Sequence, residues 1–214
     1  MLATDTARRC KGFPMPSPAT SNARFGAKSI LRRFRRSRNG SAAVEFALVA
    51  PVFFALLFAI IEVAIFFFAS QVLETVTQDS ARVLMTGQAQ TSQVCTDPVS
   101  GAPAPCNQAT FHAYACSQIP TLFDCNSLYV DVESYPAFSS LVINNQIDGT
   151  GNFTAGNMQY SPGGACAIVV VRMFYQWPLF VTGFGFNISN LSGHKRLLVA
   201  TAAFKNEPYG SGSC

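Results

Sequence analysis

The sequence predicts an α+β protein, in which a long N-terminal transmembrane helix is followed by a small antiparallel β-sheet domain with disulfides. Three observations lead to this prediction. Residues 42–69 are almost continuously apolar, six of the seven cysteines follow that stretch, and β-branched and aromatic runs lie toward the C-terminal end. A chain of 214 residues has room for one modest domain besides the membrane segment.

Residues 1–40 form a basic leader. They carry ten Lys or Arg side chains and one acidic side chain, whereas the rest of the chain carries five basic and ten acidic ones. Such a split is typical of a targeting or orienting segment, so we expect no nucleic-acid partner. The leader is rich in Pro, Ser and Ala without a sustained apolar period, which predicts a disordered cytoplasmic segment. A translation start at Met15 would shorten it and remove Cys10.

The apolar stretch 42–69 is long enough to cross a membrane. A helix rises about 1.5 Å per residue, so about 20 residues cover the roughly 30 Å hydrocarbon core, and residues 46–69 suffice with some tilt. The arginines at 32–38 place the N-terminus in the cytoplasm by the positive-inside rule. The rest of the chain is therefore expected to face outward from a single-pass anchor.

The helix is predicted to continue beyond the membrane. Residues 71–85 contain neither Gly nor Pro, and Gly87 is a residue type that commonly ends a helix. We therefore expect a helical part at 41–87 and an external cysteine-containing domain at 88–214. The elements expected in that domain are a loop at 88–107, a short helix at 108–119, strands at 128–133, 165–177 and 196–204, and a long loop or hairpin tip at 144–164.

The external cysteines are expected to form disulfides. An even number follows the span: Cys95, Cys106, Cys116, Cys125, Cys166 and Cys214. In an oxidising compartment they allow three disulfides, and sequence alone does not choose the pairing, although neighbours such as Cys95 and Cys106 are one guess. There is no CxxC pair, and His112 with Cys116 gives only two ligands, so we predict no metal and no other cofactor.

The junction at Gly40 differs from an ordinary signal peptide. A signal peptide has a shorter apolar region with the cleavage site after it, whereas here the apolar segment is full-length and runs on into helix. Cutting between Gly40 and Ser41 would leave that segment in the mature protein, with the new amine one helical turn from Glu45. The carboxylate could pair with its own amine or with that of a neighbouring subunit; alternatively, it snorkels to the cytoplasmic interface.

A second carboxylate, Glu62, lies about 25 Å further along the helix by rise and on a different face from Glu45. An ionised Glu in lipid costs free energy, so a Glu at this position indicates a functional or structural role. One hypothesis is that Glu62 meets a polar group of another transmembrane helix in an assembly. The other is a protonated Glu near the outer interface.

These residues resemble a known family. The resemblance rests on the run from Gly40 through Phe46 to Pro51, on Glu62, on Ala81-Arg82 followed by Thr86-Gly87, and on the tail from Ala200 to Tyr209. The pattern is similar to the TadE-like proteins of tight adherence (Flp, type IVb) pilus systems. It implies cleavage after Gly40 by a prepilin peptidase, with Phe46 standing where the major pilins often carry Tyr. It also implies a minor pilin-like or pilus-assembly role in which Glu45, Phe46 and Glu62 take part.

The resemblance also implies partners and a location. We expect the inner membrane, a prepilin peptidase, and other pilins and assembly components as partners, with the external domain in the periplasm. An enzyme is disfavoured because the sequence has no GxSxG, HExxH, GxGxxG or Walker pattern, so no catalytic residue and no small-molecule substrate are predicted. The alternative is an extracytoplasmic binding module on an uncleaved signal anchor.

Overall fold

The computed structural model describes residues 40–119, 123–181 and 186–210. The predicted leader up to residue 39 and Cys214 lie outside the described residues. The chain divides into two compact units, 1–50 and 51–214.

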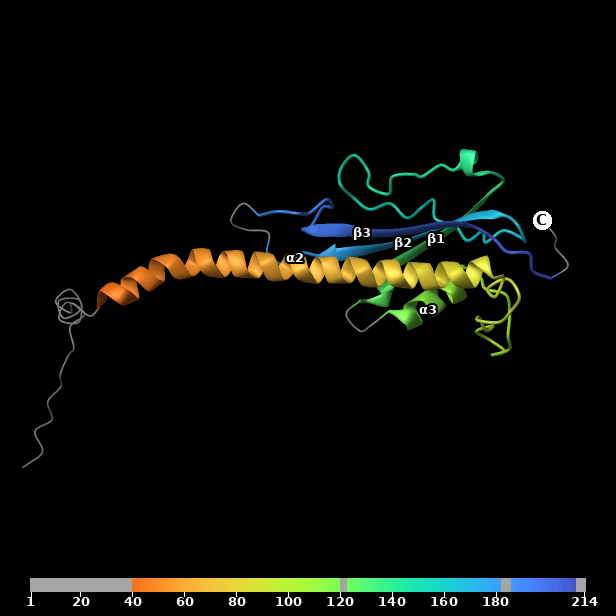
Figure 1. Cartoon of the computed structure of the whole chain (residues 1–214), viewed down its shortest axis with the longest axis horizontal. Helices are drawn as coiled ribbons and strands as arrows, with labels where there is room; N and C mark the ends of the chain where they lie inside the picture. The colour runs from red at the N-terminus through yellow and green to blue at the C-terminus, as the bar shows by residue number, and fades with distance from the viewer. Residues whose placement is uncertain (1–39, 120–122, 182–185, 211–214) are drawn as a thin grey trace, which may run out of the picture. The chain divides into compact units, whose positions relative to one another are not determined.

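The fold is α+β, as predicted (Figure 1). Its helices and strands are α2 (Ser41–Met85), α3 (Gln108–Gln118), β1 (Leu128–Tyr135), β2 (Ile168–Pro178) and β3 (Lys195–Lys205). Two 3₁₀ turns, η2 (Cys125–Ser127) and η3 (Phe138–Ser140), flank β1. The predicted long helix, short helix and three strands are therefore all present.

The three strands form one antiparallel sheet in the order β1-β2-β3. Strand β2 lies in the centre and is buried on both faces over most of its length, because its sequence is a β-branched and aromatic run. In the register, Arg172 of β2 lies opposite Asp131 of β1 on one side and Thr201 of β3 on the other.

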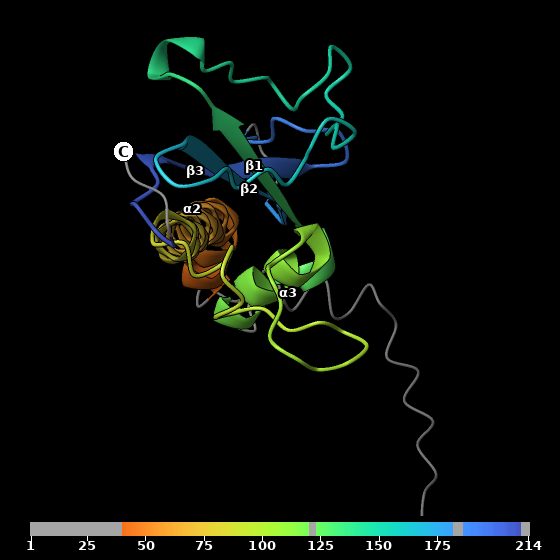
Figure 2. The ribbon, with the colours of Figure 1, turned by 90° about the vertical axis from the view of Figure 1, so that its right-hand side faces the viewer.

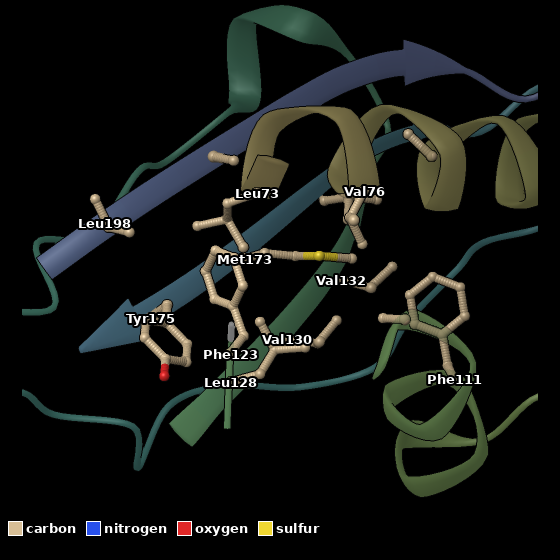
Figure 3. Close-up of a cluster of buried hydrophobic side chains, with 14 of the residues drawn as sticks. Leu73, Val76, Phe111, Phe123, Leu128, Val130, Val132, Met173, Tyr175 and Leu198 are labelled. Carbon is tan, nitrogen blue, oxygen red and sulfur yellow. The ribbon is translucent and has the colours of Figure 1, made fainter. Parts of the chain in front are cut away.

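Helix α2 packs along one face of the sheet through its C-terminal half, and α3 covers the same face beside it (Figure 2). The helix contributes Leu73 and Val76 to the core, spaced as one face of a helix requires. They pack in one cluster with Val132 and Met173 from the sheet and Phe111 from α3 (Figure 3). This cluster is the main core of the domain.

The opposite face of the sheet is covered by the long connection between β1 and β2 (Figure 2). Phe153, Ile147 and Met158 of this connection pack against Phe174 and Leu197 of the sheet. The expected long loop at 144–164 is therefore present, and it forms a second small core.

Two disulfides hold α3 and its flanking loops. Cys95 bonds Cys106, the neighbour pair guessed from sequence, and Cys116 bonds Cys125, with Cα atoms 5.2 and 5.7 Å apart. Cys166 is disulfide-bonded as well. These bonds agree with the predicted use of the external cysteines.

Candidate functional site: the membrane-type helix and its contacts

Helix α2 has two stretches with different surroundings. From Ala42 to Ile61 every side chain that the structure describes is exposed or half-buried. From Glu62 onward, buried positions recur at helical spacing, as at Ala69, Leu73 and Val76. The helix is long and apolar enough to cross a membrane, and only 11% of its most apolar window is buried, unlike a core helix of a soluble protein. Residues 42–61 cover about 30 Å at about 1.5 Å per residue, the thickness of a bilayer core.

The predicted cleavage junction lies at the start of this helix. Gly40 is the residue before α2, which begins at Ser41. A Cβ atom added at Gly40 would meet no atom within 4 Å, so the fold itself gives no reason for glycine there. Glu45 is exposed and makes no hydrogen bond or ion pair with the described part of the chain, and Phe46 is 68% exposed. Both side chains are thus available to another molecule.

Glu62 is bound within its own chain. It is 6% exposed, and its Oε1 accepts hydrogen bonds from the backbone N–H of Phe180 and, at 3.0 Å, from that of Val181. Its other oxygen, Oε2, is buried without a hydrogen-bond partner among the described residues. A contact of Glu62 with another transmembrane helix, and with it an assembly role, stays a prediction. The contact with the end of β2 was not foreseen, since nothing local links residues 118 positions apart.

The end of α2 is joined to the C-terminal tail. Gly87 has a φ of +76°, and a Cβ there would lie 2.4 Å from the ring of Tyr209. Glu207 donates its N–H to the carbonyl of Met85 at 2.8 Å. The Thr86-Gly87 segment and the tail, two parts of the resemblance, therefore meet in the structure, and Gly87 is required for both its φ and this close approach.

Asn206 completes this junction. It is buried, and its side-chain amide donates to the carbonyls of Pro162 and Gly164, both at 2.9 Å. Tyr209 donates its hydroxyl to the carbonyl of Gly163 at 3.1 Å. The tail thus links the helix end to the loop that leads into β2, which gives these residues a structural role.

A buried polar cluster in the sheet was missed by sequence reasoning. Arg172 donates from Nε and Nη2 to Oδ2 of Asp131 at 3.0 and 2.5 Å, and from Nη2 to Oε1 of Glu133 at 3.2 Å. Burial raises the pKa of Asp131, while the N–H of Gln159 and Arg172 act in the opposite direction. The one signal in the sequence is a lone Arg inside an apolar strand, which needs a carboxylate opposite it. The cluster holds the sheet rather than a ligand.

The remaining candidate residues have structural roles. Arg82 is exposed in the last turn of α2, where a cation is favourable. His112 Nε2 lies 3.0 Å from the carbonyl of Leu128, and the sulfur of Cys116 is used in its disulfide. Among the described residues there is no group of three or more metal-ligating side chains.

The comparisons with known proteins bear on the helix. Residues 40–82 match the family model of TadE-like proteins. No curated protein and no solved structure gives a significant match. The match begins at Gly40, so it covers the junction, the exposed stretch of α2 and Glu62. The match covers 43 of the 214 residues and coincides with the membrane-type helix. The chain is therefore TadE-like over residues 40–82.

Proposed function

We propose that the protein is a minor pilin-like component or assembly factor of a tight adherence pilus, processed after Gly40 by a prepilin peptidase. The observation that carries the proposal is a coincidence of boundaries. The family match begins at Gly40, the basic leader ends there, and α2 begins at the next residue. Cleavage at this point would release a subunit whose first residues are already a membrane helix.

The exposure of the helix supports this role. A pilin-like subunit must be held by lipid before assembly and by other helices afterwards, so its N-terminal helix must offer an uncovered apolar surface. Residues 42–61 offer that surface, and Glu45 and Phe46 lie uncovered within it. We propose that the basic leader stays in the cytoplasm and that residues 88–214 lie in the periplasm, where the disulfides can form.

The test is the N-terminus of the mature protein. Mass spectrometry of protein isolated from membranes of cells with an active prepilin peptidase should identify Ser41 as the first residue. Gly40→Leu should retain the leader if the peptidase reads that site. Gly149→Leu is the matched control, since a Cβ at either glycine meets no atom within 4 Å, and this variant should still begin at Ser41.

An intact leader on the wild-type protein under these conditions would contradict the proposal. That result would favour the alternative, an extracytoplasmic binding module on an uncleaved anchor. Deleting the peptidase separates the two further, because only a processed subunit changes mass in its absence.

A further inference from the structure

The connection that leaves β2 carries an exposed aromatic side chain. In this interface loop, residues 178–181, Phe180 is 82% exposed while its neighbour Leu179 is buried. Leu179 donates its N–H to the carbonyl of His194 at 3.0 Å, which fixes the base of the loop to the start of β3. Phe180 is therefore presented outward from an anchored loop.

The interface loop lies beside the outer end of the membrane-type stretch. A cavity of about 160 Å³ is lined by both the helix and the loop, and apart from Glu62 its lining is apolar. Phe58, Ile61 and Ile65 line it from the helix, and Trp177, Phe180 and Val181 line it from the end of β2 and the loop. The apolar surface of the helix thus continues onto the loop beside residues 58–65.

Glu62 accepts hydrogen bonds from two backbone N–H groups of this loop. The N–H groups of Phe180 and Val181 follow the last sheet residue, and both donate to Glu62 Oε1. An unpaired backbone N–H is costly near lipid, where water is scarce. A carboxylate at this position of the helix therefore lets the loop lie against the membrane boundary.

Two cationic side chains at the start of β3 lie next to the interface loop and its exposed Phe180. Lys195 is exposed and lies opposite Pro178 in the sheet register. Arg196 lies opposite Trp177, with its guanidinium 5.0 Å from the ring centroid of Phe66. An aromatic tip bordered by cations matches a lipid interface, in which phosphates lie just outside the acyl chains.

We propose that the interface loop is a second membrane contact, in which Phe180 enters the outer interfacial layer of the phospholipid bilayer next to the helix. Glu62 holds the loop at this level as a positioning residue, and Lys195 faces the lipid phosphates. The contact would fix the rotation and height of the domain above the membrane. This inference rests on membrane insertion of residues 42–61, which is part of the proposed function.

Tryptophan quenching in liposomes tests the contact, because the chain has a single Trp. The full chain carrying Trp177→Phe is reconstituted in phosphatidylcholine and phosphatidylglycerol with bromine placed near the headgroup or deep in the acyl chains. Three variants each add one reporter: Phe180→Trp at the loop, Phe138→Trp at an exposed phenylalanine outside the interface loop, and Phe53→Trp in the helix. We expect shallow bromines to quench Phe180→Trp at least threefold more than Phe138→Trp.

The helix reporter separates two kinds of failure. Phe53→Trp should be quenched most by deep bromines. If it is quenched and Phe180→Trp behaves like Phe138→Trp, the loop contact is wrong while the membrane anchor stands. If Phe53→Trp is not quenched, the anchor itself fails, and the contact fails with it. Blue-shifted but unquenched emission from Phe180→Trp would mean that protein covers the loop, which also overturns the proposal.

The native tryptophan gives a second measurement that leaves the core unchanged. Trp177 lines the same cavity as Phe180, so shallow bromines should quench the wild-type protein, and Phe180→Ser should lower that quenching at least twofold. Glu62→Ala should lower quenching of the Phe180→Trp reporter and leave Phe53→Trp unchanged. Unaltered loop quenching in Glu62→Ala would overturn the positioning role of Glu62.

Discussion

The two stretches of α2 share one helix but have different neighbours. Between residues 42 and 61 apolar side chains are distributed around the whole helix and remain uncovered. Between residues 69 and 85 the apolar side chains form one buried stripe, and polar residues such as Glu74 and Gln78 occupy the exposed positions. Between these two parts Ile65, Phe67 and Phe68 are still exposed. The surface changes from apolar all round to amphipathic between residues 62 and 69, and we propose that lipid contact gives way to the domain there. Glu62 is the first buried position among the described side chains of the helix.

The largest expected effect breaks the domain without touching the exposed stretch. Arg172→Ala leaves Asp131 and Glu133 without their cation inside the sheet, and breaking a buried ion pair costs about 3–5 kcal/mol. Urea unfolding of the full chain in detergent should show this loss of stability. Lys195→Ala, which removes an exposed cation, should change the free energy of unfolding by less than about 0.5 kcal/mol. Equal effects of the two variants would contradict the role given to the cluster.

The same substitution in each stretch compares them directly. Leu73 is 1% exposed against the sheet and Leu56 is 62% exposed. Leu73→Ala should lower the free energy of domain unfolding by about 2–5 kcal/mol, because it removes a buried side chain and leaves a cavity. Leu56→Ala should lower it by less than about 0.5 kcal/mol. If Leu56→Ala destabilises the domain as much as Leu73→Ala, the division of the helix is wrong.

A glycine pair tests how the second stretch ends. Gly87 and Gly101 have φ of +76° and +68°, but a Cβ at Gly101 meets no atom within 4 Å, whereas one at Gly87 meets the Tyr209 ring. Gly101→Ala should cost about 1 kcal/mol from the backbone alone. Gly87→Ala should cost more, and thermal melts measure the difference. Equal costs would show that the contact between helix end and tail adds nothing.

The smallest expected effect concerns the loop over the other face of the sheet. The N–H of Asn152, followed by the hydroxyl of Thr150, lowers the pKa of Asp148. Its folded pKa therefore lies below the unfolded value, so its stabilising effect is present above about pH 4 and is lost as the pH falls through the folded pKa. Asp148→Asn should reduce the loss of stability between pH 5 and pH 2. An unchanged acid dependence of the urea midpoint would contradict this account.

Local patterns predicted most of the fold. The apolar run, the β-branched run around Val170 and the closeness of Cys95 to Cys106 each gave a correct element or bond, because each depends on neighbours in sequence. The contact of Glu62 with the end of β2 was not predictable in this way. It depends on which face of α2 meets the sheet, and only the assembled domain determines that face.

The resemblance identified parts of the site but did not explain why these residues occur there. It identified Gly87 and the tail as separate segments, and only the structure shows that the ring of Tyr209 occupies the space a side chain at 87 would need. The contribution of Gly40 and Glu45 differs in kind. No contact within the described chain explains them, and their roles in processing and assembly stay predictions.

The central claim is that one helix is covered by lipid in its first stretch and by its own domain in its second. A diazirine amino acid placed at position 56 or at position 73 of the full chain in a bilayer tests this most directly. After photolysis, mass spectrometry should find lipid adducts at position 56 and adducts to peptides of the sheet, such as the one containing Met173, at position 73. Lipid adducts at position 73 in amounts equal to those at position 56 would contradict the account.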